Sequence, residues 1–400
     1  MWMPKTEDEI KAVVLSRRLE ETNTFDAKQE LAKTSEEIAK DIAAMAVDGG
    51  VIIYGIGEDE QKRPTRLTPV SLAGARERID SVVGTAIDEP PFVKMYTIPT
   101  EDDPSVGYVI VVVPQSPRAP HMVTIRGENS YYGRNGTGNR KLNQAEVRQL
   151  YDRNRVFEID REALLNAEIA NAPIAVNPNS SYIHMYSRPV VPNDGMLTRV
   201  SQDTSLPQSL NSLFANLDSF YKVDRIPFIS IPLSWAIRTE GFRGSVSPIN
   251  RNALNSQPET VTIQMDHNGM GHVFCARAAE REGGDGSPLI FYPTIVAGIA
   301  SRFIGIMGRL YDQANYYGEV DIGVAVTNLT GAVPSLNENS HFHFSLMNNP
   351  YDRNEYRKIE RRSAIELLEN PQQIGSDLLM PLIQAINQNN SNPFPKVKPE

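Results

Sequence analysis

Hydrophobic and polar residues alternate with two different periods along the first 155 residues. Apolar residues three to four positions apart at Ile38, Ile42 and Met45 indicate a helix that starts near Thr34 and ends at Gly49-Gly50. Short apolar runs at 51–54 and 108–113 indicate buried strands. The same patterns predict further helices over 6–21, 72–86 and 143–151, and further strands over 24–28 and 92–98. A mixed α/β domain over residues 1–160 is therefore expected.

The remainder of the chain is also predicted to contain both helices and strands, and some of them are longer. Its predicted strands and helices are, in order, strands 182–188, 228–232, 261–265 and 272–276, helix 294–313, strand 320–327 and helix 363–387. Residues 161–180 resemble a linker, and the Asn- and Pro-rich residues 389–400 a disordered tail. Because 400 residues exceed one ordinary hydrophobic core, two domains are expected. The predicted fold class is α+β. It comprises one mixed α/β domain followed by a second, at 181–388, with two long helices.

Composition narrows the class of protein. Apolar residues make up 40% of the chain and charged residues 22%, which is typical of a globular protein. The first residues lack a basic segment followed by an apolar one, and no apolar run reaches membrane-spanning length, so we expect a cytoplasmic protein without a membrane partner. Cys275 is the single cysteine, which excludes an intrachain disulfide and a cysteine-rich zinc site.

Charge is distributed unevenly along the sequence. The net charge of −9 argues against a generally basic nucleic-acid coat protein. Residues 118–155 nevertheless contain eight basic side chains against three acidic ones. Such a segment predicts a surface that faces phosphate groups, although arginines scattered over a solvated surface would give the same count.

Three short stretches, in this order, resemble the Schlafen AlbA-type (AlbA-2) family over residues 15–155. The first is Glu21-Thr-Asn-Thr-Phe-Asp26-Ala-Lys28, and the second is Gly49-Gly50, a strand and Gly55-Ile-Gly-Glu58-Asp59. The third is Tyr131-Tyr132-Gly-Arg134-Asn135-Gly before a helix that bears Glu146. The chain departs from the family pattern at Asp26, where Glu is usual, at Ala27, where Phe is usual, and in lacking an Asn before the Gly pair.

The resemblance implies nucleic-acid binding and, as in some Schlafen members, metal-dependent RNA cleavage by three carboxylates. Carried over, the catalytic residues are Glu21, Asp26, Lys28, Glu58 and Asp59. Of these, Glu21, Asp26 and Asp59 would hold Mg²⁺ or Mn²⁺, with Glu58 as the alternative to Asp59. Acidic residues at strand ends are commonly only solvated, so a polar turn at 58–60 remains open.

The resemblance and the basic segment together suggest a nucleic-acid interface. Its candidate residues are Arg126, Tyr132, Arg134, Asn135, Arg140 and Lys141. Arg134, in a glycine-rich loop, would present its guanidinium to a phosphate, or would belong to a purely structural turn. Tyr132 would stack on a base, or would be part of the core.

Other motifs are incomplete. Gly55-x-Gly57 lacks the third glycine of a dinucleotide-binding loop, and no phosphate-binding P-loop occurs. His341 and His343 would share one face of a strand, where a metal site with His267 or His272 is less favoured than ordinary strand histidines.

Three hypotheses of function remain. The protein binds nucleic acid and acts as a metal-dependent endoribonuclease in bacterial stress or phage defence. Alternatively, it is a non-catalytic DNA- or RNA-binding regulator whose C-terminal domain senses a ligand or partner. In the third hypothesis it is an assembly protein that forms a homo-oligomer through that domain.

Overall fold

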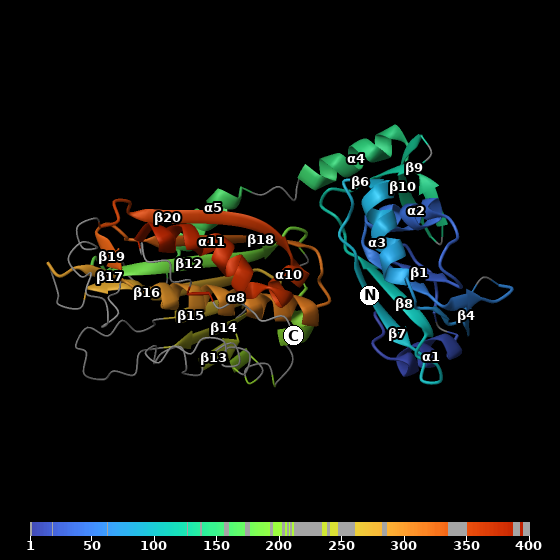
Figure 1. Cartoon of the computed structure of the whole chain (residues 1–400), viewed down its shortest axis with the longest axis horizontal. Coiled ribbons are helices and arrows are strands. Elements are labelled where there is room, and N and C mark those ends of the chain that lie inside the picture. Colours follow the sequence, from blue (N-terminus) through green and yellow to red (C-terminus); the bar gives the residue numbers. More distant parts are fainter. Residues whose placement is uncertain are drawn as a thin grey trace. The chain divides into compact units, whose positions relative to one another are not determined.

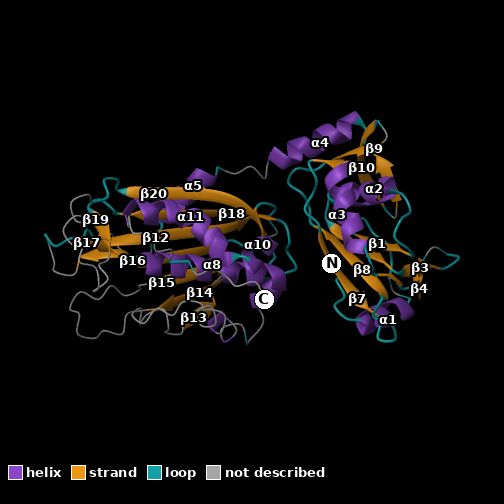
Figure 2. Cartoon of the chain, in the orientation of Figure 1, coloured by secondary structure: helices purple, strands orange, loops and turns teal. Residues whose placement is uncertain are grey.

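The chain forms two compact units, Met1–Glu158 and Ile159–Glu400, in a computed structural model (Figure 1). The structure describes residues 2–17, 19–61, 63–125, 127–136, 138–155, 160–172, 177–192, 195–201, 205, 208, 210–211, 234–237, 241–246, 261–281, 286–334, 350–386 and 393–394. Helices and strands occur in both units, which confirms the predicted mixed α/β class (Figure 2).

The central sheet of the first unit places the opening motif beside the glycine pair. Strand β1 runs parallel to β2, with Asp26 opposite Ile52, and β2 runs antiparallel to β8. Strand β8 also pairs with β5 and β7. The bounds are β1 Phe25–Lys28, β2 Gly50–Tyr54, β5 Val70–Ser71, β7 Lys94–Pro99 and β8 Val106–Val113.

A second, antiparallel sheet has the strand order β11-β10-β9-β6, and β3 and β4 form a separate hairpin. Their bounds are β3 Ile56–Glu58, β4 Pro64–Leu67, β6 Ile87–Asp88, β9 Met122–Ile125, β10 Glu128–Asn135 and β11 Gly138–Lys141. The helices are α1 Glu7–Leu15, α2 Ser35–Met45, α3 Ala75–Ala86 and α4 Gln144–Arg155. The predicted helix over 6–21 is too long, since α1 ends at Leu15 and Arg17 takes a positive φ of 55°.

The core of the first unit lies where α2 and α3 meet both sheets. Ile38 and Ile42 of α2 and Ile79 of α3 are fully buried and belong to one cluster with Ile52 of β2 and Val111 of β8. The helical and strand periods read from the sequence therefore mark the faces that pack together.

The glycine pair after α2 serves two separate purposes. Gly49 has a φ of +77° and donates its N–H to the Met45 carbonyl oxygen at 2.8 Å, as expected for the residue that ends a helix. Gly50 is needed for a different reason, because the neighbouring atoms leave no room for a side chain. A Cβ atom there would lie 2.2 Å from Met45 Sδ and 2.5 Å from the Thr24 carbonyl oxygen.

The second unit contains a nine-stranded sheet with the main order β13-β14-β15-β16-β12-β18-β20. All neighbours along this path are antiparallel, while β17 pairs with β16 and runs parallel to β19. The bounds are β12 Ser180–Pro189, β13 Ser234–Ile237, β14 Gly241–Val246, β15 Val261–Asp266, β16 Gly271–Arg281, β17 Leu289–Phe291, β18 Glu319–Thr327, β19 Ala332–Pro334 and β20 Glu355–Ser363.

Helices cover the two faces of this sheet unequally. Helices α8, α10 and α11 pack on the face that carries Met185 and Val324, and α8 is buried along most of its length. Helix α5 packs on the opposite face, where Leu165 contacts Tyr186 and Ala325. The helices are α5 Arg161–Ala170, α6 Thr198–Ser201, α8 Pro293–Gln313, α10 Ala364–Glu369 and α11 Pro371–Ile386.

Several expectations for this region need correction. The predicted linker over 161–180 contains α5, whose Leu165 is fully buried. The predicted long helix over 363–387 is divided at Asn370, because Pro371 cannot continue the hydrogen bonding of the preceding turn and starts a new helix. Within the predicted disordered tail, Phe394 is buried in the core, and most of the tail lies outside the described residues.

The predicted strand at 228–232, together with His341 and His343, also lies outside the described residues. Among the helices that the structure describes, none combines the length and the hydropathy needed to cross a membrane.

We expect Gly50→Val to lower the melting temperature of the first unit, because the added atoms would collide with the backbone at Thr24. Differential scanning calorimetry of the purified chain measures this. Gly84→Ala is the matched control: a Cβ there meets nothing within 4 Å, and replacing glycine inside a helix should stabilise α3 by about 0.5–1 kcal/mol. An unchanged transition in Gly50→Val would refute the packing argument.

Candidate functional site

A buried ionic cluster lies at the centre of the family-like motifs. Asp26 points from β1 into the interior and is fully buried. Its Oδ2 lies 3.1 Å from Arg134 Nη1 and 3.2 Å from Lys28 Nζ. The Arg134 side chain is only 2% exposed, whereas Lys28 is 36% exposed. One carboxylate therefore contacts two cations, which come from β1 and β10.

Glu21 approaches the same carboxylate from the segment before β1. Its Oε1 accepts a hydrogen bond from the Ala27 N–H at 3.0 Å. Burial raises the pKa of Glu21 to about 7, and the neighbouring charge of Asp26 acts in the same direction. Glu21 thus holds a proton near neutral pH, where an ordinary glutamate would have lost it.

A third acid, Asp41 of α2, joins the cluster and was missed by the sequence analysis. Its Oδ1 accepts a hydrogen bond from Asn139 Nδ2 at 2.5 Å, and burial raises its pKa to about 6. Burial by itself would lower the pKa of Lys28, but attraction to Asp41, Asp26 and Glu21 outweighs it and leaves that pKa raised. Asp41 lies three positions after Ile38, a spacing that puts both residues on one face of the helix, and this was the available signal.

The cluster fastens the β10–β11 hairpin to the rest of the unit. Arg134 Nη2 donates to the Thr22 carbonyl oxygen at 3.3 Å, and the Gly136 N–H donates to Asn23 Oδ1 at 2.8 Å. Asn139 of β11 reaches Asp41 of α2, as described above. The opening motif and the Tyr-Tyr-x-Arg-x-Gly motif, more than 100 residues apart, are therefore in direct contact.

The predicted metal triad is not assembled. Glu21 and Asp26 are brought together, but Asp59 binds within its own turn, where its carboxylate accepts from the Arg63 N–H and pairs with the Arg63 guanidinium at 3.2 Å. Glu58 ends the short strand β3 of the same hairpin. Across the described residues, no three His, Cys, Asp or Glu side chains are grouped closely enough to hold a metal ion.

The side chains present also do not fit Mg²⁺ or Mn²⁺. A divalent cation at Asp26 would have to displace Lys28 and Arg134 from the carboxylate that both contact. We therefore assign no chemical step to a metal at this position.

The structure divides the predicted nucleic-acid-binding residues into three groups. Arg134 and Tyr132 are interior: Tyr132 is 5% exposed and belongs to the core, with Lys40 Nζ 5.2 Å from its ring centroid. Arg140 is exposed but forms two hydrogen bonds with Glu146, at 2.6 and 2.9 Å. Asn135 and Lys141 lie at the surface, and Arg126 lies outside the described residues.

Comparison with known families agrees with the motif analysis. Residues 21–143 match the model of the family described as Schlafen, AlbA_2. The first unit therefore carries a Schlafen AlbA_2 domain, which suggests a nucleic-acid-related function. The match ends before the second unit begins. No curated protein matches the sequence.

We expect Asp26→Asn to destabilise the first unit by about 3–5 kcal/mol, because removing one partner leaves buried Arg134 without the charge it faces. Urea denaturation monitored by circular dichroism measures the loss. The exposed pair Arg76–Asp80 is the control, and Asp80→Asn should change stability by about 0–1 kcal/mol. Similar small losses in both variants would contradict a structural role for Asp26.

Glu21 should make the first unit less stable as pH rises. Its folded-state pKa of about 7 exceeds its ordinary value of 4.5, so the folded state binds more protons between these limits and stability falls from about pH 4.5 to 7. Glu21→Gln removes this contribution. The melting temperature of the variant, relative to that of the wild type, should therefore rise between pH 5 and pH 8. Exposed Glu60→Gln serves as the control and should follow the wild type throughout. Parallel pH profiles of all three proteins would show that Glu21 titrates normally.

Proposed function

We propose that the first unit binds nucleic acid through phosphate contacts made by β11 and α4. The family match supports a nucleic-acid-related function, and the position of the basic residues indicates which surface serves it. Phosphate contacts depend on accessible Lys and Arg side chains, since they replace the counterions of the nucleic acid. Buried Arg134, the first candidate from the sequence, cannot make such a contact without leaving Asp26.

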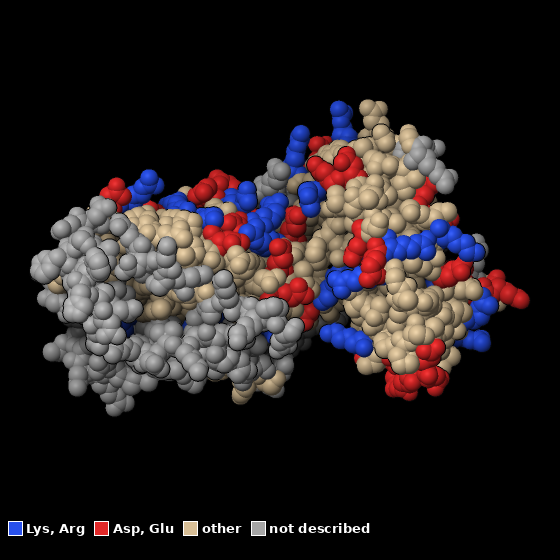
Figure 3. Space-filling view, in the orientation of Figure 1, with Lys and Arg blue, Asp and Glu red and all other residues tan. Residues whose placement is uncertain are grey.

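The observation that carries the proposal is the lack of a buried face on α4. None of its 12 residues is buried, although a helix on a globular protein ordinarily buries one apolar stripe. Residues 138–155 contain five basic and two acidic side chains in a chain of net charge −9. Figure 3 shows Lys and Arg side chains projecting from the part of the first unit that α4 occupies.

Helix α4 is held in place by its own last turn. Arg153 donates from Nη2 to the Val47 carbonyl oxygen at 2.7 Å and pairs with Asp48 at 3.2 Å, at the end of α2. Asn143 caps the first turn by accepting from the Glu146 N–H at 3.0 Å. The exposed Arg148 therefore lies on a helix whose first turn is capped and whose last turn is fixed to the rest of the unit, and such a helix presents a charge at a defined position.

Binding fits the geometry better than metal-dependent hydrolysis does. Of the acids that the family pattern would assign to cleavage, Asp26 pairs with Lys28 and Arg134, and Glu21 accepts from the Ala27 N–H. Glu58 and Asp59 belong to the β3–β4 hairpin. Their arrangement stabilises the fold of the unit and leaves the phosphate contacts to its surface.

We expect Lys141→Ala and Arg148→Ala each to weaken binding of single-stranded RNA and of DNA. If each residue neutralises one phosphate, each substitution should reduce the slope of log K against log salt by about 0.7–0.9. Fluorescence anisotropy with labelled oligonucleotides at several salt concentrations measures both quantities, with and without EDTA.

Arg309→Ala is the control, because Arg309 is exposed on α8 of the second unit. Wild-type affinity in both first-unit variants, or binding that does not depend on salt, would refute the proposed surface. Arg134→Ala belongs to the stability experiments, since its side chain is interior.

A further inference from the structure

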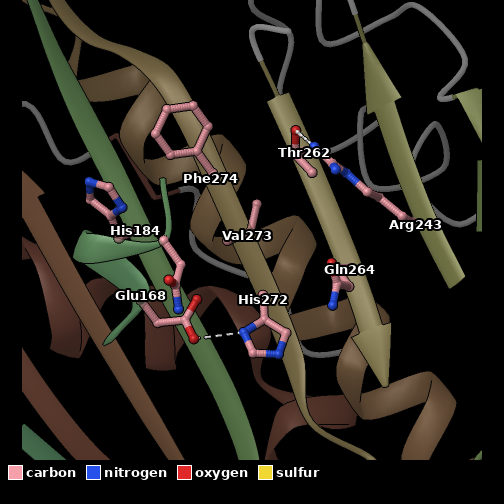
Figure 4. A pocket seen from close by; sticks show the side chains of 9 residues that line it. Glu168, His184, Arg243, Thr262, Gln264, His272, Val273 and Phe274 are labelled. Carbon is pink, nitrogen blue, oxygen red and sulfur yellow. Dashed lines mark hydrogen bonds and ion pairs between the residues drawn. The ribbon is translucent and has the colours of Figure 1, made fainter. Parts of the chain in front are cut away.

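A cavity of about 270 Å³ opens on the second unit, on the face of the nine-stranded sheet opposite α8. Two neighbouring rows of side chains run across its strands. In one row His184 of β12, Phe274 of β16 and Thr262 of β15 are paired in register. In the other row His272 of β16 is paired with Gln264 of β15 (Figure 4).

The second row continues to Arg243 of β14, which is in register with Gln264. Intervening residues of the same strands, such as Ile263 and Cys275, face the core on the other side of the sheet. The strand alternation therefore collects polar and aromatic side chains on one face of the sheet.

At one wall of this cavity, the His272 imidazolium connects helix α5 to the sheet. His272 Nδ1 donates to Glu168 Oε1 of α5 at 2.7 Å, and His272 Nε2 donates to Asp266 Oδ2 at 3.2 Å. Burial by itself would lower the pKa of His272, but these two carboxylates outweigh burial and raise that pKa to about 9. The ring therefore carries a proton on each nitrogen at neutral pH, and its single positive charge offsets one of the two negative charges beside it.

The opposite side of the cavity is cationic and rich in hydrogen-bonding groups. Figure 4 shows Arg243 across the cavity from Glu168, with the Thr262 and Gln264 side chains between them. Arg243 Nη2 donates to Thr262 Oγ1 at 3.5 Å. Gln264 Nε2 donates to Asp266 Oδ1 at 2.9 Å, which fixes the amide and leaves its Oε1 as an acceptor.

Aromatic rings line a further part of the cavity. Phe274 contacts His184 edge to face, with 5.4 Å between the ring centroids, and stacks against Tyr182 at 5.8 Å. Burial lowers the pKa of His184 to about 4, so its ring is neutral at physiological pH. The cavity thus combines an apolar aromatic wall, a fixed amide and a guanidinium within a small volume.

We propose that this cavity binds a single nucleoside monophosphate. The base would contact Phe274 and donate an amino or ring N–H to Gln264 Oε1, since side-chain amides match the hydrogen-bonding edges of bases. The phosphate would lie against Arg243, whose planar guanidinium suits two phosphate oxygens. The volume is slightly below the range of about 300–1,000 Å³ that accommodates drug-sized ligands, which limits the occupant to one nucleotide.

Isothermal titration calorimetry of the full chain with AMP, GMP, CMP and UMP tests the proposal. At least one of them should bind with a dissociation constant below about 1 mM and about tenfold more tightly than its own nucleoside, because the phosphate adds charge-assisted hydrogen bonds. Arg243→Gln should abolish that tenfold preference, and Gln264→Leu should weaken both nucleotide and nucleoside.

Two controls separate this cavity from other effects. Arg309→Gln, on the opposite face of the unit, should bind as the wild type does. Arg148→Glu, in the first unit, should lose oligonucleotide binding and keep mononucleotide binding. Arg243→Lys retains the charge and should keep a measurable preference for the nucleotide, and thermal melting of every variant confirms that it folds.

The proposal is overturned if none of the four nucleotides binds at 5 mM, roughly the weak limit of specific recognition. It is also overturned if Arg243→Gln leaves the nucleotide preference intact, or if inorganic phosphate alone binds as tightly as the nucleotide. Loss of mononucleotide binding in Arg148→Glu would instead place the ligand on the first unit.

Discussion

The first unit depends on one carboxylate, that of Asp26, because three parts of the chain converge on it. Asp26 is fully buried between Lys28 of its own strand and Arg134 of the β10–β11 hairpin, while Glu21 and Asp41 share its surroundings. Placing so many charges in the interior is costly unless each is paired or neutralised. Here Glu21 meets that requirement by retaining a proton and Arg134 by contacting both a carboxylate and a carbonyl oxygen. The family-like motifs are therefore segments of a single structural cluster.

The fold class and most helices and strands could be predicted from the sequence, because they follow from the local periodicity of apolar residues. Strands β2 and β8 and helices α2 and α8 match their predicted ranges closely, since each has an apolar pattern of the correct period. The division of α10 from α11 was signalled by Pro371, yet the apolar pattern continues across it and concealed the break. Helix α5 was hidden by the prolines that follow it, although its Asp160 cap is an ordinary helix start.

The candidate site could be predicted only in part from the sequence, because the order of the motifs carries no information on the direction of their side chains. Arg134 and Tyr132 were selected as nucleic-acid-binding candidates, but the sequence could not show that both point inward. The proximity of Asp41 to Asp26 depends on how α2 packs on the sheet, and no spacing rule contains that packing. The cavity of the second unit was equally hidden: Arg243, Thr262 and His272 come from three different strands, and only the register between those strands brings them together.

Strand β11 has a consequence that reaches beyond ligand binding, since it is the outermost strand of its sheet. Such a strand carries unpaired backbone N–H and C=O groups along its free side, and a strand from another molecule can pair with them. Lys141 places a positive charge on this edge, beside the Arg140–Glu146 ion pair. Two copies that approach edge to edge would bring positive charges close to one another, and that repulsion would disfavour such pairing.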